Sequence, residues 1–400
     1  MSGHILWPLL GVVLALVVFG LIEGMLHRSR LRRIPIRIHV NGTRGKSSVT
    51  RLIAAGLREG GVLVCAKTTG TLPRLILPNG DEYPIFRVSH ANVIEQVRIV
   101  SAAAQIGARA LVIECMAVQP FLQWLSETTL IRATHAVITN ARADHLDVMG
   151  PTEEDVALAL AGMIPQKSVL FTAEREHLGL FRKIAGECGT ECVPITAGDV
   201  KEIGEAEMGG FGHVEHAENV ALALKVCRTV GVDRETALRG MWRSAPDPGA
   251  MTTHELDFFG RRIVFVNGFA ANDPESTCQI WEMMLARFPN VEKRIILFNC
   301  RNDRPDRSDQ LGRDCVNWSP ADHYILIGAG TYILGRAAMK AGMDRRKIIY
   351  VDNRPVSEIF EVCLGLSGRS SLVMGMANIG GQGLEVVDYF KNRSMLTQTV

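Results

Sequence analysis

A glycine-rich segment that contains one lysine and two adjacent serines directly follows an apolar run. The segment is HVNGTRGKSS, residues 39–48. In a phosphate-binding loop, backbone N–H groups and a helix N-terminus hold phosphate oxygens, a lysine reaches the β- and γ-phosphates, and a serine hydroxyl binds Mg²⁺. Lys46 and Ser47 stand where such a loop needs them. Val40 replaces the first glycine of the common form, so the shorter GxxGKS pattern alone is equally compatible with an ordinary turn.

Polar side chains also stand at the ends of two later apolar runs. Glu114 closes ALVIE, residues 110–114, and four more follow HAVIT within eight residues: Asn140, Asp144, His145 and Asp147. A lone glutamate at a strand end can simply be solvated, but the order of the motifs favours a carboxylate that holds the Mg²⁺ bound to ATP. We predict Ser47, Glu114 and His145 as metal ligands, and Lys46, Glu114 and His145 as the catalytic residues.

The elements that carry these residues are predicted to alternate between strands and helices. Residues 36–40, 110–114 and 135–140 are short, apolar and rich in β-branched side chains, which is typical of strands buried on both faces. Residues 48–57 and 219–231 have a helical pattern. The alternation predicts an α/β domain with a mostly parallel sheet, whose ligand lies beyond the carboxyl ends of the strands.

The length of 400 residues exceeds one ordinary core. SAPDPGAM, residues 244–251, is rich in proline and glycine and is predicted to be a linker. Five apolar runs follow it: RIVFV, RIILF, YILIG, KIIYV and LVMGM. We therefore predict a central domain over 34–245 and a smaller α/β domain over 246–400.

Residues 1–33 are predicted to be a membrane anchor with a basic flank. Residues 5–22 form an uncharged apolar run that is interrupted only by Pro8. As a helix they would span about 27 Å. Four arginines follow: Arg28, Arg30, Arg32 and Arg33. A cleaved signal peptide carries its charges before the apolar run, so this order favours a single-pass anchor in the cytoplasmic membrane, with the remaining chain in the cytoplasm.

The overall composition excludes some partners. A formal net charge of +2 gives no reason to expect nucleic-acid binding. The nine cysteines are scattered, and the closest pair, Cys188 and Cys192, is a poor zinc motif. Reduced thiols in the cytosol are the expected state.

In this order the motifs resemble the ATP-binding core of the Mur ligases and folylpolyglutamate synthases. TRGKSS, Glu114 and TNARADHLD match first, HAENVALA is similar to the HNxxN helix of these enzymes, and PDPGAM to their interdomain PGRM. VNGFAANDP and CRNDRPDRS loosely resemble two motifs of their C-terminal domain, DYAHNP and GGDRDxxKR. A membrane helix stands where Mur enzymes carry an N-terminal domain. Together with ECMAVQP, this replacement resembles the catalytic subunits of poly-γ-glutamate synthases, the CapB/PgsB type.

The resemblance implies an ATP-dependent amide ligase that polymerises glutamate into poly-γ-glutamate through an acyl phosphate, releasing ADP and phosphate. It implies a Mur-ligase-like P-loop central domain, a Rossmann-like C-terminal domain, and ATP and Mg²⁺ as cofactors. The implied partners are L- or D-glutamate, the growing chain, and small integral-membrane subunits for synthesis and export. The implied nucleotide contacts are Asn41, Gly42, Thr43, Arg44, Gly45, Lys46, Ser47, Ser48, Asn140, Asn219, Asn267 and Arg304.

Several positions depart from the family pattern. Ala250 replaces the arginine of PGRM, and Asn267 the aspartate of DYAHNP. Lys167 is not expected to be the carbamylated lysine of many Mur enzymes, because it is predicted to begin a strand.

Other signals have a structural interpretation. His213 and His216 are expected at a solvated helix start. Arg301, Arg304 and Arg307 form either a self-paired surface loop or a clamp for an anionic group.

Two other functions fit parts of the chain. A P-loop ATPase that energises a membrane transporter would hydrolyse ATP without glutamate, but the DHLD and PGxM motifs favour a ligase. A soluble ligase like folylpolyglutamate synthase would not need the N-terminal anchor.

Overall fold

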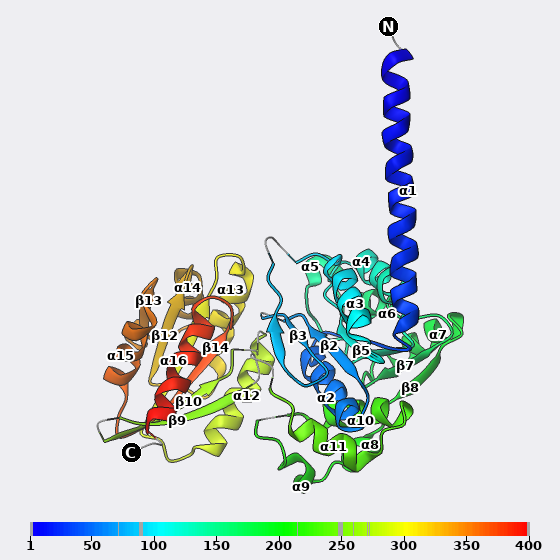
Figure 1. Cartoon of the computed structure of the whole chain (residues 1–400). Coiled ribbons are helices and arrows are strands. Elements are labelled where there is room, and N and C mark those ends of the chain that lie inside the picture. The colour runs from blue at the N-terminus through cyan, green and yellow to red at the C-terminus, as the bar shows by residue number, and fades with distance from the viewer. Residues whose placement is uncertain are drawn as a thin grey trace. The chain divides into compact units, whose positions relative to one another are not determined.

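The computed structural model describes residues 3–397, apart from 71, 88–90, 214, 247–250, 259, 270 and 272. The chain divides into two compact units, Met1–Asp247 (unit 1) and Pro248–Val400 (unit 2). Figure 1 labels their helices and strands. Residues 247–250 of the predicted linker SAPDPGAM, including Ala250, lie outside the described residues.

The N-terminal apolar run forms one long helix, α1 (Gly3–Arg33). Within its segment Leu10–Arg33, a window of 18 residues has a mean hydropathy of 2.2 and only 6% of that window is buried, so the helix is long and apolar enough to cross a membrane. The helix continues 11 residues beyond the predicted run 5–22, through all four arginines, because arginine is a good helix former. Figure 1 shows α1 extending beyond the rest of unit 1.

The last turn of α1 is part of the folded unit. Leu31 and Ile34 are buried in one cluster with Ile99 and Val100 of α3 (Glu95–Ile106). His27 Nε2 lies 2.9 Å from the carbonyl oxygen of Leu130. These contacts fix the basic end of α1 against unit 1.

Unit 1 is built on an eight-stranded sheet in the order β4-β3-β2-β5-β1-β6-β7-β8. The strands are β1 (Ile36–Asn41), β2 (Val64–Thr68), β3 (Arg74–Ile76), β4 (Glu82–Pro84), β5 (Ala110–Glu114), β6 (His135–Ile138), β7 (Val169–Thr172) and β8 (Glu191–Pro194). All neighbours pair in parallel except β2 with β3 and β3 with β4. The mostly parallel sheet is confirmed, and Lys167 lies just before β7.

Helices cover both faces of this sheet. One face packs against α2 (Lys46–Glu59), α10 (Ala217–Thr229) and α11 (Arg234–Trp242). The other packs against the end of α1, α3, α6 (Glu153–Ala161) and α7 (Leu178–Glu187). Shorter helices are α4 (Pro120–Leu125), η1 (Ser126–Ile131), α5 (Leu146–Met149), α8 (Ala197–Lys201) and α9 (Glu205–Met208). Burial on both faces explains why the strands read as continuous apolar runs.

A charged pair is buried under β1. His39 is fully buried, and its Nδ1 lies 2.8 Å from Oε2 of Glu127 in η1, which is 1% exposed. Burial on its own lowers the pKa of His39, but contacts with Cys115 and Glu127 outweigh it and raise the pKa to about 9. The imidazole is therefore protonated at neutral pH, and the pair ties β1 to η1.

Unit 2 has a six-stranded sheet in the order β13-β12-β11-β14-β10-β9. The strands are β9 (Thr252–Phe258), β10 (Arg261–Asn267), β11 (Lys293–Cys300), β12 (His323–Gly328), β13 (Ile348–Asp352) and β14 (Ser370–Ala377). Each of the five predicted apolar runs is a strand, and these five pair in parallel. The unpredicted β9 is antiparallel to β10.

Helices cover both faces of the second sheet as well. α12 (Pro274–Arg287), α13 (Pro305–Asp314) and α14 (Thr331–Lys340) pack on one face. α15 (Val356–Leu366) and α16 (Gln382–Thr397) pack on the other. Two short 3₁₀ turns, η2 (Cys315–Asn317) and η3 (Arg345–Lys347), complete the unit.

Candidate functional site

The segment between β1 and α2, residues 41–47 (the glycine loop), needs both of its glycines. Gly42 has φ 130° and Gly45 has φ 80°, in the region that favours glycine. A Cβ on Gly42 would lie 2.0 Å from Thr139 Oγ1, and one on Gly45 would lie 2.9 Å from Asn219 Oδ1. Gly45 precedes α2 without a side-chain cap, so the first N–H groups of α2 are available to an anion.

Lys46 folds back over this loop. Its Nζ donates hydrogen bonds to the carbonyl oxygens of Gly42 at 2.5 Å and Thr43 at 3.2 Å. The ammonium group therefore lies directly above the loop backbone. Phosphate oxygens held by the loop would be acceptors for the same group.

The end of β6 holds the glycine loop in shape. Thr43 Oγ1 and the Arg44 N–H donate to Asn140 Oδ1 at 2.7 and 3.0 Å, and Asn140 Nδ2 donates to the Arg44 carbonyl oxygen at 3.2 Å. Thr139 Oγ1 donates to that same carbonyl oxygen at 2.6 Å. The contacts of Asn140 and Thr139 thus position the loop, and sequence reasoning missed Thr139.

Ser47 and Glu114 meet beyond the ends of two neighbouring strands, β1 and β5. Ser47 Oγ donates to Glu114 Oε2 at 2.8 Å, and the N–H of Thr69 donates to the same oxygen at 2.7 Å. Glu114 is 2% exposed. Its predicted position on the loop side of the sheet, within reach of Ser47, is confirmed. Thr69 was not predicted, although TTG at residues 68–70 resembles a strand end followed by a turn.

Asn219 lies against Gly45 and belongs to a buried polar group. Asn219 Nδ2 donates to Glu215 Oε1 at 2.9 Å, and His213 Nε2 lies 3.7 Å from Glu215 Oε2. The side chains of His213 and Glu215 are only 8% and 4% exposed. Burial raises the pKa of Glu215, but hydrogen bonds from His213 and Asn219 outweigh it and lower the pKa. The predicted solvated helix start is therefore wrong for His213, whereas His216 is exposed.

Asn41 and Ser48, two of the expected nucleotide contacts, are described by the burial of their side chains and by their neighbours. Asn41 is buried, and its Nδ2 donates to Gln123 Oε1 at 2.8 Å. Gln123 in turn donates to the Val118 carbonyl oxygen at 2.8 Å. The Asn41 side chain thus supports the loop from the protein interior, and a nucleotide contact of Asn41 stays a prediction. Ser48 lies half-buried in the first turn of α2.

His145 lies in the loop between β6 and α5. It precedes α5 with φ 49°, and its Nε2 is 3.9 Å from Asp144 Oδ1. Its side chain is 28% exposed. A role for His145 as third metal ligand stays a prediction.

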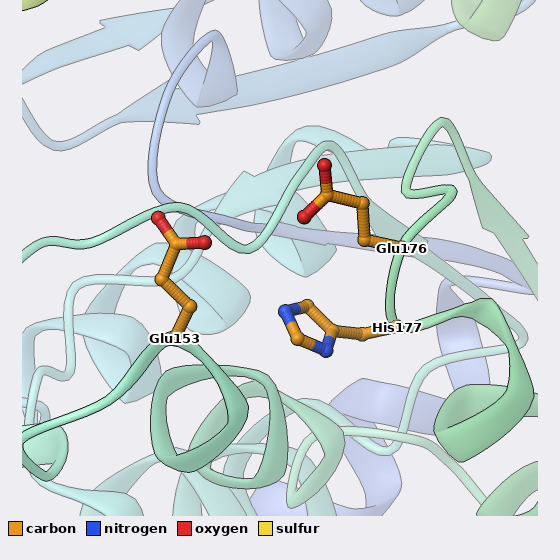
Figure 2. A group of neighbouring side chains, drawn as sticks. All are labelled: Glu153, Glu176 and His177. Atoms are coloured by element: carbon orange, nitrogen blue, oxygen red, sulfur yellow. The ribbon is translucent and has the colours of Figure 1, made fainter.

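A second group of possible metal ligands lies near this loop. Glu153 in α6, with Glu176 and His177 before α7, has ligand atoms within 4.8 Å of one another, and Figure 2 shows the three side chains pointing into one space. Glu153 Oε1 also accepts a hydrogen bond from the Ala143 N–H at 2.9 Å. No sequence spacing reveals this group, and both carboxylates are exposed, so it does not by itself assign a metal.

The expected contacts in unit 2 lie at the carboxyl ends of its strands. Asn267 is 1% exposed at the end of β10, and Arg304 is exposed where α13 begins. Arg301 is paired with Asp303 at 2.7 Å, and Arg307 Nη1 donates to Asn378 Oδ1 at 2.6 Å. The basic cluster is thus partly self-paired. Nucleotide contacts of Asn267 and Arg304 stay predictions.

Comparisons with known proteins bear on both units. Residues 40–184 match the Mur ligase middle domain, and residues 253–393 match the Poly-gamma-glutamate synthase CapB C-terminal domain. The chain is 38% identical over 375 residues to the capsule biosynthesis protein CapB of Bacillus anthracis, covering 93% of this chain and 80% of that protein. It is 34% identical over 385 residues to the PGA synthase CapB of Bacillus subtilis (strain 168), covering 96% and 97%.

Solved structures share the fold. One is the bifunctional folylpolyglutamate synthase/dihydrofolate synthase of Yersinia pestis, solved with AMPPNP and a Mn ion. It matches with a TM-score of 0.64 at 15% identity over 94% of this chain and 92% of that chain.

Proposed function

This chain belongs to the CapB family of poly-γ-glutamate synthases, which are ATP-dependent amide ligases of the Mur ligase type, and we propose that it extends the polymer through an acyl phosphate. In the first step a terminal carboxylate oxygen attacks the γ-phosphorus of ATP, and ADP leaves. In the second step an amino nitrogen attacks the acyl carbon, phosphate leaves, and the nitrogen loses a proton. Each amide bond then consumes one ATP.

The glycine loop is proposed to hold the phosphates of ATP. The first N–H groups of α2 point out of the loop, and Lys46 lies above it. Asn140 and Thr139 keep the loop in this shape through Thr43 and Arg44. Catalysis then consists mainly of positioning and of stabilising charge at the γ-phosphate.

The observation that carries this proposal is the contact between Ser47 and Glu114. Octahedral Mg²⁺ with ligands at about 2.1 Å places adjacent ligand oxygens about 3 Å apart. Ser47 Oγ and Glu114 Oε2 are 2.8 Å apart, so the pair fits two neighbouring positions on one ion, and His145 is the proposed third ligand. When bound, Mg²⁺ would offset the charge that develops at the γ-phosphate. The Yersinia pestis enzyme, with AMPPNP and a Mn ion, is consistent with a nucleotide and a divalent metal.

The products of ATP distinguish this mechanism from adenylation. The full-length protein should be assayed in membranes with its partner subunits, with and without glutamate. We expect one ADP and one phosphate per amide bond, a hydroxamate when hydroxylamine is supplied, and loss of both activities in Lys46→Ala. AMP and pyrophosphate as coupled products would contradict the mechanism. ATP hydrolysis that ignores glutamate but needs a transported substrate would support the transporter ATPase instead.

The helix α1 is proposed to anchor the catalytic units to the cytoplasmic face of the membrane. Its apolar segment is exposed, and its arginines follow that segment, which places this end in the cytoplasm. Membrane fractions should retain the protein, and protease added to intact cells should leave the catalytic region intact. Recovery of the full-length chain in the soluble fraction would contradict the anchor. Glutamate, the growing polymer and small membrane subunits are the proposed partners.

A further inference from the structure

A cavity lined almost entirely by arginines lies where the end of α1 packs against the rest of unit 1. Its lining residues are Arg28, Leu31, Arg32, Arg37 and Arg132, and its volume is about 280 Å³. Small-molecule sites usually have volumes of roughly 300–1,000 Å³. The cavity therefore has room for a phosphate with a small attached group.

The arginines of this cavity have an unbalanced positive charge. Among the described residues Arg28, Arg32 and Arg132 form no salt bridge. Arg28 and Arg32 are one helical turn apart, a spacing at which like charges repel. The nearby carboxylate of Glu127 is buried and bonded to His39 and to the Ala133 N–H. The Glu127 carboxylate acts on Arg37 from the protein interior, but no carboxylate is among the residues that line the cavity.

Arg37 builds the wall of the cavity and fixes its parts. Its Nη1 donates to the carbonyl oxygens of Leu31 at 3.2 Å and Ile34 at 2.7 Å, which close the end of α1. Its Nη2 donates to the carbonyl oxygen of Arg132 at 2.7 Å. The two sides of the cavity, about 100 residues apart in sequence, are therefore held together whether or not a ligand is present.

The position of the cavity along α1 matches the head-group layer of a bilayer. Exposed apolar side chains of α1 end at Leu26, which is 52% exposed. Arg28 and Arg32 follow after two and six residues, or about 3 and 9 Å along the helix axis. A bilayer of about 40–45 Å with a hydrocarbon core of about 30 Å leaves roughly 5–7.5 Å for each head-group layer. Arg28 therefore falls within that layer, and Arg32 falls just beyond it on the cytoplasmic side.

We propose that this cavity binds the phosphate of an anionic phospholipid head group in the cytoplasmic leaflet. Guanidinium groups bind phosphate oxygens in pairs of hydrogen bonds, and basic pockets on this side of a membrane are suited to anionic lipids. The proposal rests on the proposed anchoring by α1. A bound lipid would neutralise the cavity and hold unit 1 at a fixed height above the membrane.

Lipid binding to the detergent-solubilised full-length protein tests the proposal. Native mass spectrometry should be used to titrate dioctanoyl phosphatidylglycerol, dioctanoyl phosphatidylcholine, inorganic phosphate and a γ-glutamate oligomer. We expect the phosphatidylglycerol to bind at least tenfold more tightly than each of the other three. Arg28→Gln, Arg32→Gln and Arg132→Gln should each weaken this binding about fivefold.

Two double variants with equal charge provide the matched comparison. Arg28→Gln with Arg32→Gln removes two arginines from the cavity, and we expect binding to weaken about 25-fold. Arg30→Gln with Arg33→Gln removes two arginines that lie in the same turns of α1 but do not line the cavity. Binding should stay within about twofold of wild type, because the hydrogen bonds from the cavity arginines to the phosphate contribute more than the net charge of α1. Arg132→Gln changes the cavity without changing α1, so its effect cannot come from anchoring.

The outcomes separate this site from the anchor. Membrane fractionation of the same proteins tests anchoring separately from lipid binding. A full-length chain in the soluble fraction would contradict the proposed anchoring by α1. An anchored chain that binds phosphatidylglycerol and phosphatidylcholine equally, or loses lipid equally in both double variants, would overturn the lipid site. Tighter binding of inorganic phosphate or of the γ-glutamate oligomer would also overturn it, assigning the cavity to free phosphate or to the polymer.

Discussion

Replacing Asn140 by alanine tests whether the end of β6 positions the glycine loop. The change removes three hydrogen bonds, to Thr43 Oγ1, the Arg44 N–H and the Arg44 carbonyl oxygen. A neutral hydrogen bond contributes about 1 kcal/mol net, so the three bonds together stabilise the loop conformation by roughly 3 kcal/mol. If all of it stabilises the phosphate-binding shape, kcat/KM for ATP falls about 10²-fold, because each 1.36 kcal/mol is about tenfold.

A smaller change at the neighbouring Thr139 gives a reference for the loss of kcat/KM expected in Asn140→Ala. Thr139→Val removes one hydroxyl, which donates at 2.6 Å to the same Arg44 carbonyl oxygen and more weakly, at 3.3 Å, to the Asn41 carbonyl oxygen, and it keeps the volume of a side chain that is 1% exposed. It should lower kcat/KM about fivefold, corresponding to about 1 kcal/mol. The two variants therefore differ in the number of loop contacts removed.

The assay is the initial rate of glutamate-dependent ADP formation at varied ATP, with the protein reconstituted in membranes. Circular dichroism and the melting temperature show whether each variant is folded. A folded Asn140→Ala enzyme with kcat/KM within about threefold of wild type would refute the reasoning. So would a Thr139→Val effect as large as that of Asn140→Ala.

Three further perturbations act on single contacts. Glu114→Gln keeps an oxygen for the Ser47 hydroxyl and the Thr69 N–H but loses its charge, so the Mg²⁺ concentration for half-maximal activity should rise at least about tenfold; an unchanged Mg²⁺ titration would exclude Glu114 as a ligand. Gly42→Ala places a Cβ 2.0 Å from Thr139 Oγ1 at φ 130°, so it should lower the melting temperature and abolish activity, whereas Gly61→Ala, also at positive φ but with open space around it, should keep activity. His39 has its pKa raised from 6.5 to about 9 by Cys115 and Glu127, so the stability from these contacts is complete below pH 6.5 and lost as pH rises through 9. The free energy of unfolding of wild type relative to His39→Gln should fall by about 3 kcal/mol over this window, and a constant difference would contradict the charged pair.

Local sequence patterns predicted the strands and helices that carry the candidate site, although not β9. Strand and helix are local properties, since apolar periodicity and glycine placement depend on neighbouring residues. IRIHV, ALVIE and the five runs of unit 2 are strands for this reason, and the glycine loop follows from two glycines before Lys46. The carboxyl-end rule for parallel sheets placed Glu114 beside Ser47 without knowledge of the strand order. Family resemblance added the reaction, because local patterns do not name a substrate.

Which distant residues meet depends on how the elements pack. The order β5-β1-β6 puts Glu114 and Asn140 on either side of the glycine loop, a result of how whole faces pack. Asn41 faces Gln123 across 82 residues of sequence, and His39 faces Glu127 across 88. No periodicity records such pairings, and a polar residue such as Glu215 appears solvated until the elements around it are packed. The arginine cavity has the same origin, because Arg132 joins Arg28 and Arg32 only when η1 packs against the end of α1.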